Sequence, residues 1–179
     1  ISILYLRHWC WSCIHKKNKK NDSNIVASSF QIGNESKNIL FQHAPGDDAA
    51  KIIKPIGAKF LYLYPAISPG IFNINKGNGV TFAAKVIYDK YIIDFQTVRI
   101  DPANNRDDQK WSVMKLGPFP QSDESYSFDL ELITDPNGDN SYDQSGWGGF
   151  IWDNEQMQIN QKYQLINSDL MNIYENKQA

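Results

Sequence analysis

Cysteine is scarce in this chain of 179 residues, which has only Cys10 and Cys13. A domain formed after residue 13 therefore holds no disulfide, and a chain of this length can bury a sizeable core without one. This absence fits a cytosolic domain and a bacterial secreted domain equally well. Cys10-x-x-Cys13, with His8 and His15 nearby, suggests a metal or redox site. No βαβ pattern follows it, so we favour cysteines without such a role.

Strong charge and catalytic motifs are also lacking. The net charge of −2 argues against a nucleic-acid partner, which needs a clustered basic face. After residue 15 the only histidine is His43, and no nucleophile elbow, phosphate-binding glycine loop or His-Glu-x-x-His motif occurs. A glycoside hydrolase needs two carboxylates facing one cleft, for which Asp94, Asp129 and Glu131 are the candidates. We expect a protein that is not an enzyme, and a glycoside-hydrolase-like activity is the less favoured alternative.

No apolar run reaches the roughly 20 residues that a membrane helix needs. Ile1–Leu6 and Trp9–Ile14 are mostly apolar, and a lysine-rich stretch follows them. We interpret residues 1–24 as a tail, either the end of a membrane helix or a leader, with a packed N-terminal segment as the alternative. On the first interpretation residues 1–15 tether the domain to a membrane, and the location is extracytoplasmic or membrane-associated.

Two-residue alternation, which is typical of β-strands, is abundant. Tyr126–Leu132 alternates apolar with mostly polar residues, as a strand with one solvated face requires. Val80–Tyr88 and Tyr91–Ile100 are rich in β-branched and aromatic residues, and Phe60–Tyr64 is apolar on both faces. Shorter candidate strands are Ser29–Ile32, Ile39–Gln42, Trp111–Leu116 and Phe150–Trp152.

Turn-forming residues separate these runs. Asp89-Lys90 is spaced to join two strands as a tight hairpin, although it lacks the favoured glycine. Helical spacing occurs in Asn167–Lys177. We therefore predict an all-β fold, an antiparallel β-sandwich or jelly roll over residues 25–160, and an extension, 161–179, with a short C-terminal helix. The predicted turns are Pro45–Asp48, Pro69-Gly70, Gly77–Gly79, Asp101-Pro102 and Pro136–Asp139.

Oxygen-bearing side chains are densest between residues 135 and 143. Asp135, Asn137, Asp139 and Asp143 stand at the first, third, fifth and ninth positions of this stretch, a spacing with which loops wrap calcium. Glycine falls at the fourth position rather than the sixth, and the twelfth position is not Glu. Because Asp, Asn and Gly also form tight turns by bonding their own backbone, loop bracing is favoured and a calcium site is its alternative.

Glycines flank Trp147 on both sides and let other groups approach its backbone closely. The indole either covers one end of the core, which we favour, or stacks on the CH face of a pyranose ring. In the second case Asn140, Tyr142 and Asp143 supply the remainder of a ligand-binding site.

Three stretches together resemble a known family. They are Ile39-Leu-Phe-Gln-His-Ala-Pro45, Lys110-Trp-Ser-Val-Met-Lys-Leu116, and Thr134-Asp-Pro-Asn-Gly-Asp-Asn-Ser-Tyr-Asp143 with Gly146-Trp-Gly148. Over residues 38–152 the chain resembles the extracytoplasmic carbohydrate-binding-module-like β-sandwiches found at the C-termini of some bacterial multi-spanning membrane glycosyltransferases, and as free-standing domains. In that family an Asp-rich loop precedes a Tyr-Asp-x-x-x-Trp element, which Asp135, Asp139, Tyr142, Asp143 and Trp147 match in order.

The resemblance implies a galactose-binding-like jelly roll. One departure is Gln144, where the family tends to carry an aromatic residue. Sequence and resemblance together predict a non-catalytic extracytoplasmic module that binds a glycan or lies next to one. The alternative is a structural or assembly subunit that docks onto a protein partner through exposed aromatic residues.

Overall fold

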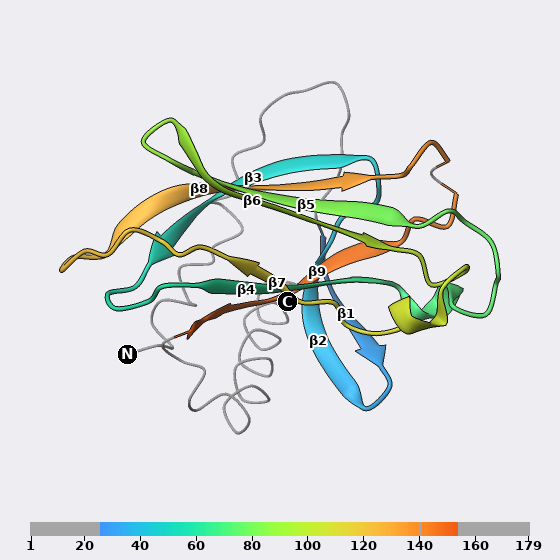
Figure 1. Cartoon of the computed structure of the whole chain (residues 1–179). Helices are drawn as coiled ribbons and strands as arrows, with labels where there is room; N and C mark the ends of the chain where they lie inside the picture. Colours follow the sequence, from blue (N-terminus) through green and yellow to red (C-terminus); the bar gives the residue numbers. More distant parts are fainter. Residues whose placement is uncertain (1–25, 140, 154–179) are drawn as a thin grey trace, which may run out of the picture.

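A computed structural model of the chain describes residues 26–139 and 141–153, which form a pair of β-sheets that face each other (Figure 1). Two single-turn 3-10 helices, η2 (Pro69–Ile71) and η3 (Arg106–Asp108), lie in the connections. The strands are β1 (Val26–Ile32), β2 (Glu35–Phe41), β3 (Gly46–Lys54), β4 (Leu61–Ile67), β5 (Val80–Tyr88), β6 (Tyr91–Ile100), β7 (Met114–Leu116), β8 (Tyr126–Asp135) and β9 (Ser145–Trp152).

All pairings between neighbouring strands are antiparallel. One sheet has the order β1-β2-β9-β4-β7 and the other the order β3-β8-β5-β6. Only the β1–β2 and β5–β6 connections stay within one sheet, and the other six pass from one sheet to the other, so strands adjacent in sequence are often not hydrogen-bonded neighbours. The antiparallel β-sandwich that the sequence predicts is confirmed.

The predicted alternation places the core between the sheets. Val80, Phe82, Ala84 and Val86 of β5 are completely buried. They lie beside Leu130 and the other apolar residues of β8, whose intervening residues face outward. Leu61 and Leu63 of β4 are equally buried from the opposite sheet, while the alternating Tyr62 and Tyr64 lie on the outer face. Period-two burial of aliphatic and aromatic side chains is therefore the main source of cohesion in the fold.

The hairpin predicted at Asp89-Lys90 is present. Asp89 and Lys90 have φ angles of 46° and 73°, both in the left-handed region that a two-residue type I′ turn requires. The turn joins β5 directly to β6. A tight hairpin therefore forms here without the glycine that usually relieves these angles.

One predicted turn is wrong, and one predicted strand, Phe150–Trp152, begins five residues earlier than expected. The sequence predicts a turn that includes Gly46, Asp47 and Asp48, but these residues begin β3, which pairs with β8 along its whole length. Ser145–Gly149 forms the beginning of β9, the central strand of its sheet. β3 begins with polar residues and β9 begins with several glycines. Neither beginning therefore shows the hydrophobic alternation from which strands are predicted.

Other expectations fall outside the described residues: the tail 1–24 with Cys10 and Cys13, and the C-terminal helix Asn167–Lys177. Within residues 26–139 and 141–153, no helix has the length and apolar character needed to cross a membrane.

The fully buried Gln42 joins the two sheets through its side chain. Its carbonyl oxygen accepts a hydrogen bond of 2.8 Å from Trp147 Nε1 on β9. Its amide nitrogen donates to Asp48 Oδ2 on β3 and to the carbonyl oxygen of Leu132 on β8, each at 3.0 Å. Every polar atom of this amide is therefore paired, as a buried polar network requires.

Replacing Gln42 is predicted to destabilise the protein by about 1–3 kcal/mol, because Gln42→Leu leaves the buried indole N–H of Trp147 without its acceptor and removes one hydrogen bond from Asp48. Urea unfolding followed by tryptophan fluorescence measures this change. The matched control is Gln31→Leu, since the Gln31 amide bonds the carbonyl of Gly33 at an exposed site. Equal midpoints for the two variants would show that the Gln42 network contributes nothing specific.

Glycines on β9 make room for a second layer of apolar side chains on the outside of the larger sheet. This layer contains Phe30, Ile32, Ile39, Ala66 and Trp111. A Cβ atom at Gly148 would lie 2.8 Å from Trp111 Cζ3, and one at Gly146 would lie 2.5 Å from Ile39 Cδ1. The glycines around Trp147 therefore serve neighbouring side chains on the opposite face of the strand, and not the indole of Trp147.

Candidate functional site

The candidate site is the end of the sandwich formed by the acidic loop, residues 135–143, and the β4–β5 connection beside it. Asn137 holds the two together. Its Nδ2 donates to the carbonyl of Gly79 at 2.9 Å, and its Oδ1 accepts from the hydroxyl of Thr81 at 2.9 Å. Asn78 Nδ2 donates in turn to the carbonyl of Asn137 at 2.8 Å. Reciprocal side-chain-to-backbone bonds of this kind fix a loop without regular secondary structure.

The first two aspartates of the acidic loop each support a local turn. Asp135 Oδ1 accepts a hydrogen bond of 2.8 Å from the N–H of Asn137, and Asp139 Oδ1 accepts one of 2.9 Å from the N–H of Ser141. The bond from Ser141 lowers the pKa of Asp139, which is fully exposed and stays ionised at neutral pH. The favoured interpretation of this loop, bracing by its own side chains, agrees with these contacts.

Three of the calcium ligands predicted from spacing, Asp135, Asn137 and Asp139, make hydrogen bonds within the protein. Asn137 already uses its side-chain oxygen on Thr81. Within the portion of the chain that the structure describes, no three His, Cys, Asp or Glu side chains are grouped closely enough to hold a metal ion. Asn140 lies outside the described residues, so calcium remains a prediction.

Asp143 is buried where the sequence suggested a ligand contact. The residue is only 1% exposed, and its Oδ2 has no hydrogen-bond partner. Burial, reinforced by the charges of Asp139 and Asp135, raises the pKa of this carboxyl from 3.8 to about 7. Asp143 is therefore an internal acid that is partly protonated at neutral pH, and it does not belong to the open surface.

Among the predicted ligand residues that the structure describes, Tyr142 is the one that reaches the surface. It is 37% exposed, and its backbone has φ 68°, which a bulky L-residue rarely adopts. The backbone of Gly77 packs against it, because a Cβ atom at Gly77 would lie 3.5 Å from that of Tyr142. The β4–β5 connection thus supports this unusual conformation from one side.

Trp147 cannot act as a sugar platform in this structure. Its side chain is completely buried, its N–H is bonded to Gln42, and its ring meets Phe82 edge-on with centroids 5.1 Å apart. Burial follows from alternation along β9, because Trp147 lies opposite the core residue Leu40 of β2. The favoured interpretation as a core residue holds, and the stacking alternative is wrong.

The acidic residues considered for glycoside hydrolysis are engaged elsewhere. Asp129 forms an ion pair with Lys51 at 3.2 Å, and Glu131 forms one with Lys85 at 2.5 Å. Asp94 pairs in register with Val86, on the other face of the sheet from Lys85, and its Oδ2 accepts from the N–H of Gly117 at 2.7 Å. The three carboxylates do not face one another across a cleft.

Sequence reasoning missed a polar scaffold beneath the acidic-loop end. Asp101 accepts from the side chains of Asn104 and Arg99, and Arg99 Nη2 also donates to the carbonyl of Asn78 at 2.8 Å. Asn104 Nδ2 reaches the carbonyl of Gly77 at 3.4 Å. These residues lie around Asp101-Pro102, which the sequence marks as a turn. Nothing in a single sequence shows that they contact Gly77 and Asn78 of the β4–β5 connection.

The buried acid makes stability depend on pH. Because the folded pKa of Asp143 is near 7 and its ordinary value is 3.8, the folded state binds more protons than the unfolded state between these values. Stability from this group is complete below about pH 4 and falls, by at most about 1.4 kcal/mol per pH unit, as pH rises towards 7. Asp143→Asn is expected to remove this decline.

Chemical unfolding in calcium-free buffer between pH 5 and 7.5 tests the expectation. The difference in unfolding free energy between Asp143→Asn and the native chain should grow in favour of the variant as pH rises. Asp107→Asn, at an exposed position on η3, is the control and should run parallel to the native chain. A parallel curve for Asp143→Asn would contradict a raised pKa.

Comparison with known proteins gives distant similarities. No family model matches the chain. An uncharacterized protein of Archaeoglobus fulgidus is 26% identical over 133 residues, 66% of this chain and 31% of that protein. The chain thus spans about a third of the length of that relative.

Several solved structures also resemble the chain. The CBM51 from Clostridium perfringens GH95, in complex with methyl-galactose, has a TM-score of 0.47 at 11% identity, covering 83% of this chain and 97% of that one. The CBM51-2 and INT domains from Clostridium perfringens ZmpB give 0.44 at 13% identity, covering 72% and 25%. The C-terminal family 22 carbohydrate binding module of Clostridium thermocellum Xyn10B gives 0.41 at 11% identity, covering 74% and 82%. The chain is similar to these carbohydrate-binding modules. The function proposed below rests on the residues of this chain.

Proposed function

We propose that the chain is a non-catalytic, extracytoplasmic module that binds a glycan at its acidic-loop end. The observation that carries this proposal is Tyr142, an aromatic side chain held half-exposed by a left-handed backbone conformation. Strain of this kind costs on the order of 1–3 kcal/mol and tends to mark sites where a side chain must be presented to a ligand.

The surroundings of Tyr142 supply the polar contacts that a sugar needs. Asp139 is ionised and fully exposed, so one of its oxygens can accept a hydrogen bond from a sugar hydroxyl. An aromatic face beside a fixed acceptor is an arrangement that binds the CH face and hydroxyls of a pyranose.

Tyr142→Ala is expected to weaken glycan binding at least tenfold, because it removes the stacking surface and leaves the core intact. A glycan array would select the ligand, and calorimetric titration with and without calcium would give the affinities. Tyr91→Ala is the matched control, since Tyr91 is 72% exposed at the tip of the β5–β6 hairpin and away from the acidic loop. No response to a broad panel under either condition would remove the proposal.

Calcium is the cofactor proposed for the same end of the sandwich. The unpaired Oδ2 of Asp143 is a carboxylate oxygen that lacks a positive partner, and hard cations prefer such ligands. A bound cation would keep Asp143 ionised and would make glycan affinity depend on calcium in the titrations above.

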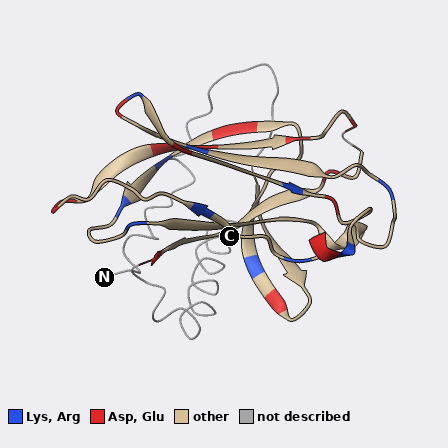
Figure 2. Cartoon of the chain, viewed as in Figure 1, with Lys and Arg blue, Asp and Glu red and all other residues tan. Residues whose placement is uncertain are grey.

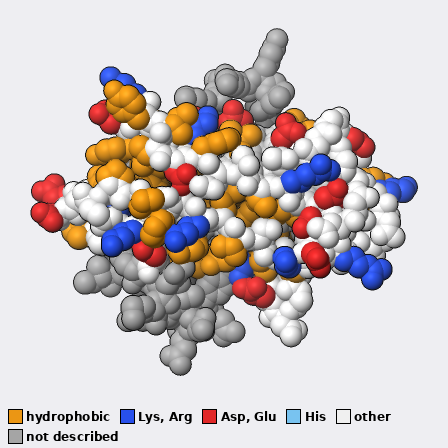
Figure 3. All heavy atoms as spheres, viewed as in Figure 1, with side chains coloured by type: hydrophobic (Ala, Val, Ile, Leu, Met, Phe, Trp, Pro, Cys, Tyr) orange, Lys and Arg blue, Asp and Glu red, His pale blue; other side chains and the backbone are white. Residues whose placement is uncertain are grey.

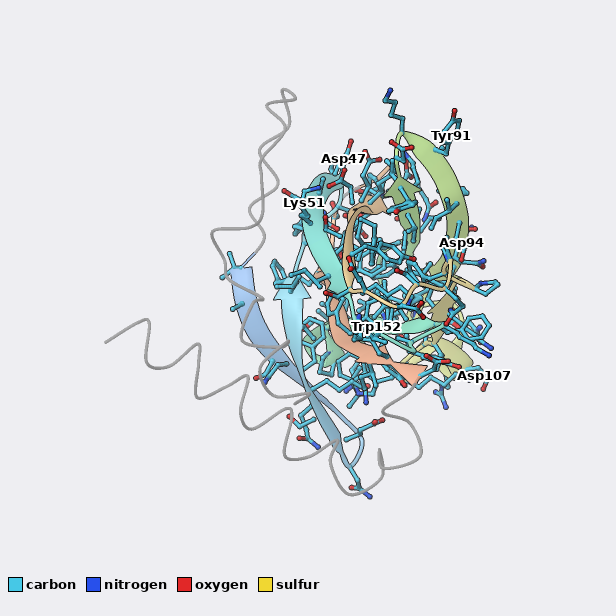
Figure 4. The ribbon with its side chains drawn as sticks, turned by 90° about the vertical axis from the view of Figure 1, so that its left-hand side faces the viewer. Asp47, Lys51, Tyr91, Asp94, Asp107 and Trp152 are labelled. Carbon is cyan, nitrogen blue, oxygen red and sulfur yellow. The ribbon has the colours of Figure 1, made fainter. Side chains whose placement is uncertain are left out.

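A second candidate function, docking onto a protein partner, is favoured by the outer face of β6. Ile92 and Phe95 are 60% and 53% exposed, and Tyr91 extends from the neighbouring hairpin tip (Figure 4). Phe95 lies opposite Lys85 of β5, which is itself paired with Glu131. Large apolar side chains exposed together on a sheet face are typical of contact surfaces between proteins.

Site-specific photocrosslinking in the native host tests this second candidate. A photoreactive residue at position 95 is expected to give one discrete crosslinked product, whose protein component mass spectrometry identifies. The control is the same residue at position 129, on the ion-paired half of the same sheet. Equal or absent crosslinking at the two positions would exclude docking through β6.

A further inference from the structure

We infer that the outer face of β4 and β7 is a second binding surface, and that it takes an anionic carbohydrate, one that bears carboxylate or sulfate groups. We call it the β4–β7 surface and define it by Phe60, Tyr62, Val113 and Lys115. This inference rests on the proposed function in one respect, that the ligand is a glycan. It lies at the opposite end of β4 from Ile67, which pairs with Ser145 next to the acidic loop.

Strand register brings the key side chains together. Tyr62 of β4 and Lys115 of β7 are direct cross-strand partners, so both lie on the same face of the sheet. Val113, two residues before Lys115, is 61% exposed. β7 is the edge strand of its sheet, and Lys115 on it is exposed.

The ammonium of Lys115 is held over aromatic rings. Its Nζ lies 3.7 Å from the centroid of Phe60 and 5.9 Å from that of Tyr62. Such cation–π contacts restrict an otherwise flexible side chain and leave the ammonium able to donate to another acceptor. The charge is thereby placed at a fixed point above an aromatic surface.

Among the residues that the structure describes, no carboxylate neutralises this charge. Ion pairs hold Lys37 to Glu35, Lys51 to Asp129 and Lys85 to Glu131, but within residues 26–139 and 141–153 no acidic group lies within ion-pair distance of Lys115. The carboxylate of Asp153, near the start of β4, accepts instead from the backbone N–H groups of Lys59 and Phe60, at 2.7 Å and 3.1 Å.

The surface views agree with this arrangement. A basic residue marks β7 in Figure 2, and hydrophobic and basic side chains lie next to one another over the β4 and β7 side of the molecule in Figure 3. A positive charge beside aromatic rings complements a ligand with a negative charge next to an apolar face. A uronate or sulfated sugar combines both on one ring: its CH face fits Tyr62 and its acid group fits Lys115.

Chemical-shift titration of the ¹⁵N-labelled protein tests the inference. The probes are an oligogalacturonate and a neutral oligogalactoside of the same length. The acidic probe is expected to shift the backbone amides of Tyr62, Val113 and Lys115, and its binding should weaken with added salt. The neutral probe should leave these amides unchanged.

Variants separate the charge from the fold. Lys115→Met keeps the aliphatic stem and removes the ammonium, so we expect acidic-probe binding to weaken at least fivefold with an unchanged melting temperature. Lys90→Met, at the exposed turn of the β5–β6 hairpin, is the control and should bind as the native chain does. Equal binding by Lys115→Met, or shifts confined to other strands, would overturn the inference.

Two further outcomes have defined meanings. Equal binding of a poly-glutamate peptide at the same amides would show that the surface recognises negative charge in general, which also overturns the inference. Tyr142→Ala tests binding at the acidic-loop end alone, and Lys115→Met tests binding at the β4–β7 surface alone. The two proposals can therefore fail independently, and the variant that leaves binding unchanged shows which one has failed.

Discussion

The side chain of Gln42 is the contact on which the rest of the sandwich depends. Hydrophobic burial brings two sheets together, but it does not by itself fix how one sheet is placed over the other. Gln42 bonds Trp147 in one sheet and Asp48 and Leu132 in the other, and any sliding of the sheets would break these bonds inside a dry core.

The same network also anchors the start of β9. The backbone N–H of Gln42 donates to the carbonyl of Ser145 at 2.9 Å, and the Ser145 hydroxyl donates to the carbonyl of Gln42. The acidic loop ends at Asp143, two residues before this anchor. The conformation of Tyr142 is therefore set from two directions, by the β4–β5 connection on one side and by the core of the sandwich on the other.

Much of the fold could be predicted from the sequence because alternation is a direct consequence of strand geometry. Val80–Tyr88 and Tyr91–Ile100 coincide with β5 and β6, and the hairpin between them is predicted correctly. The β3 strand was missed since Asp48 and Lys54 occupy inward positions, where a polar residue contradicts the expected pattern. Burial of those residues depends on partners from distant strands, which local periodicity cannot reveal.

The site was less predictable than the fold. Loop bracing by Asp135 and Asn137 follows from the chemistry of their side chains, which the sequence displays directly. The burial of Asp143 and the exposure of Tyr142 depend on the direction in which the chain turns between the two residues. The sequence around them does not indicate this direction. Lys115 stood in a predicted strand, but its position over Phe60 requires the pairing of β4 with β7.

The glycines at outward-facing positions of β9 make the sizes of residues that are far apart in sequence depend on one another. Since Gly148 has no side chain, the ring of Trp111 rests directly on the strand, and Gly146 likewise accommodates Ile39. A larger residue at either glycine becomes tolerable only when the side chain above it shrinks by a comparable volume. In homologous chains, a larger residue at position 148 should therefore accompany a smaller one at position 111. The same relation should hold for positions 146 and 39.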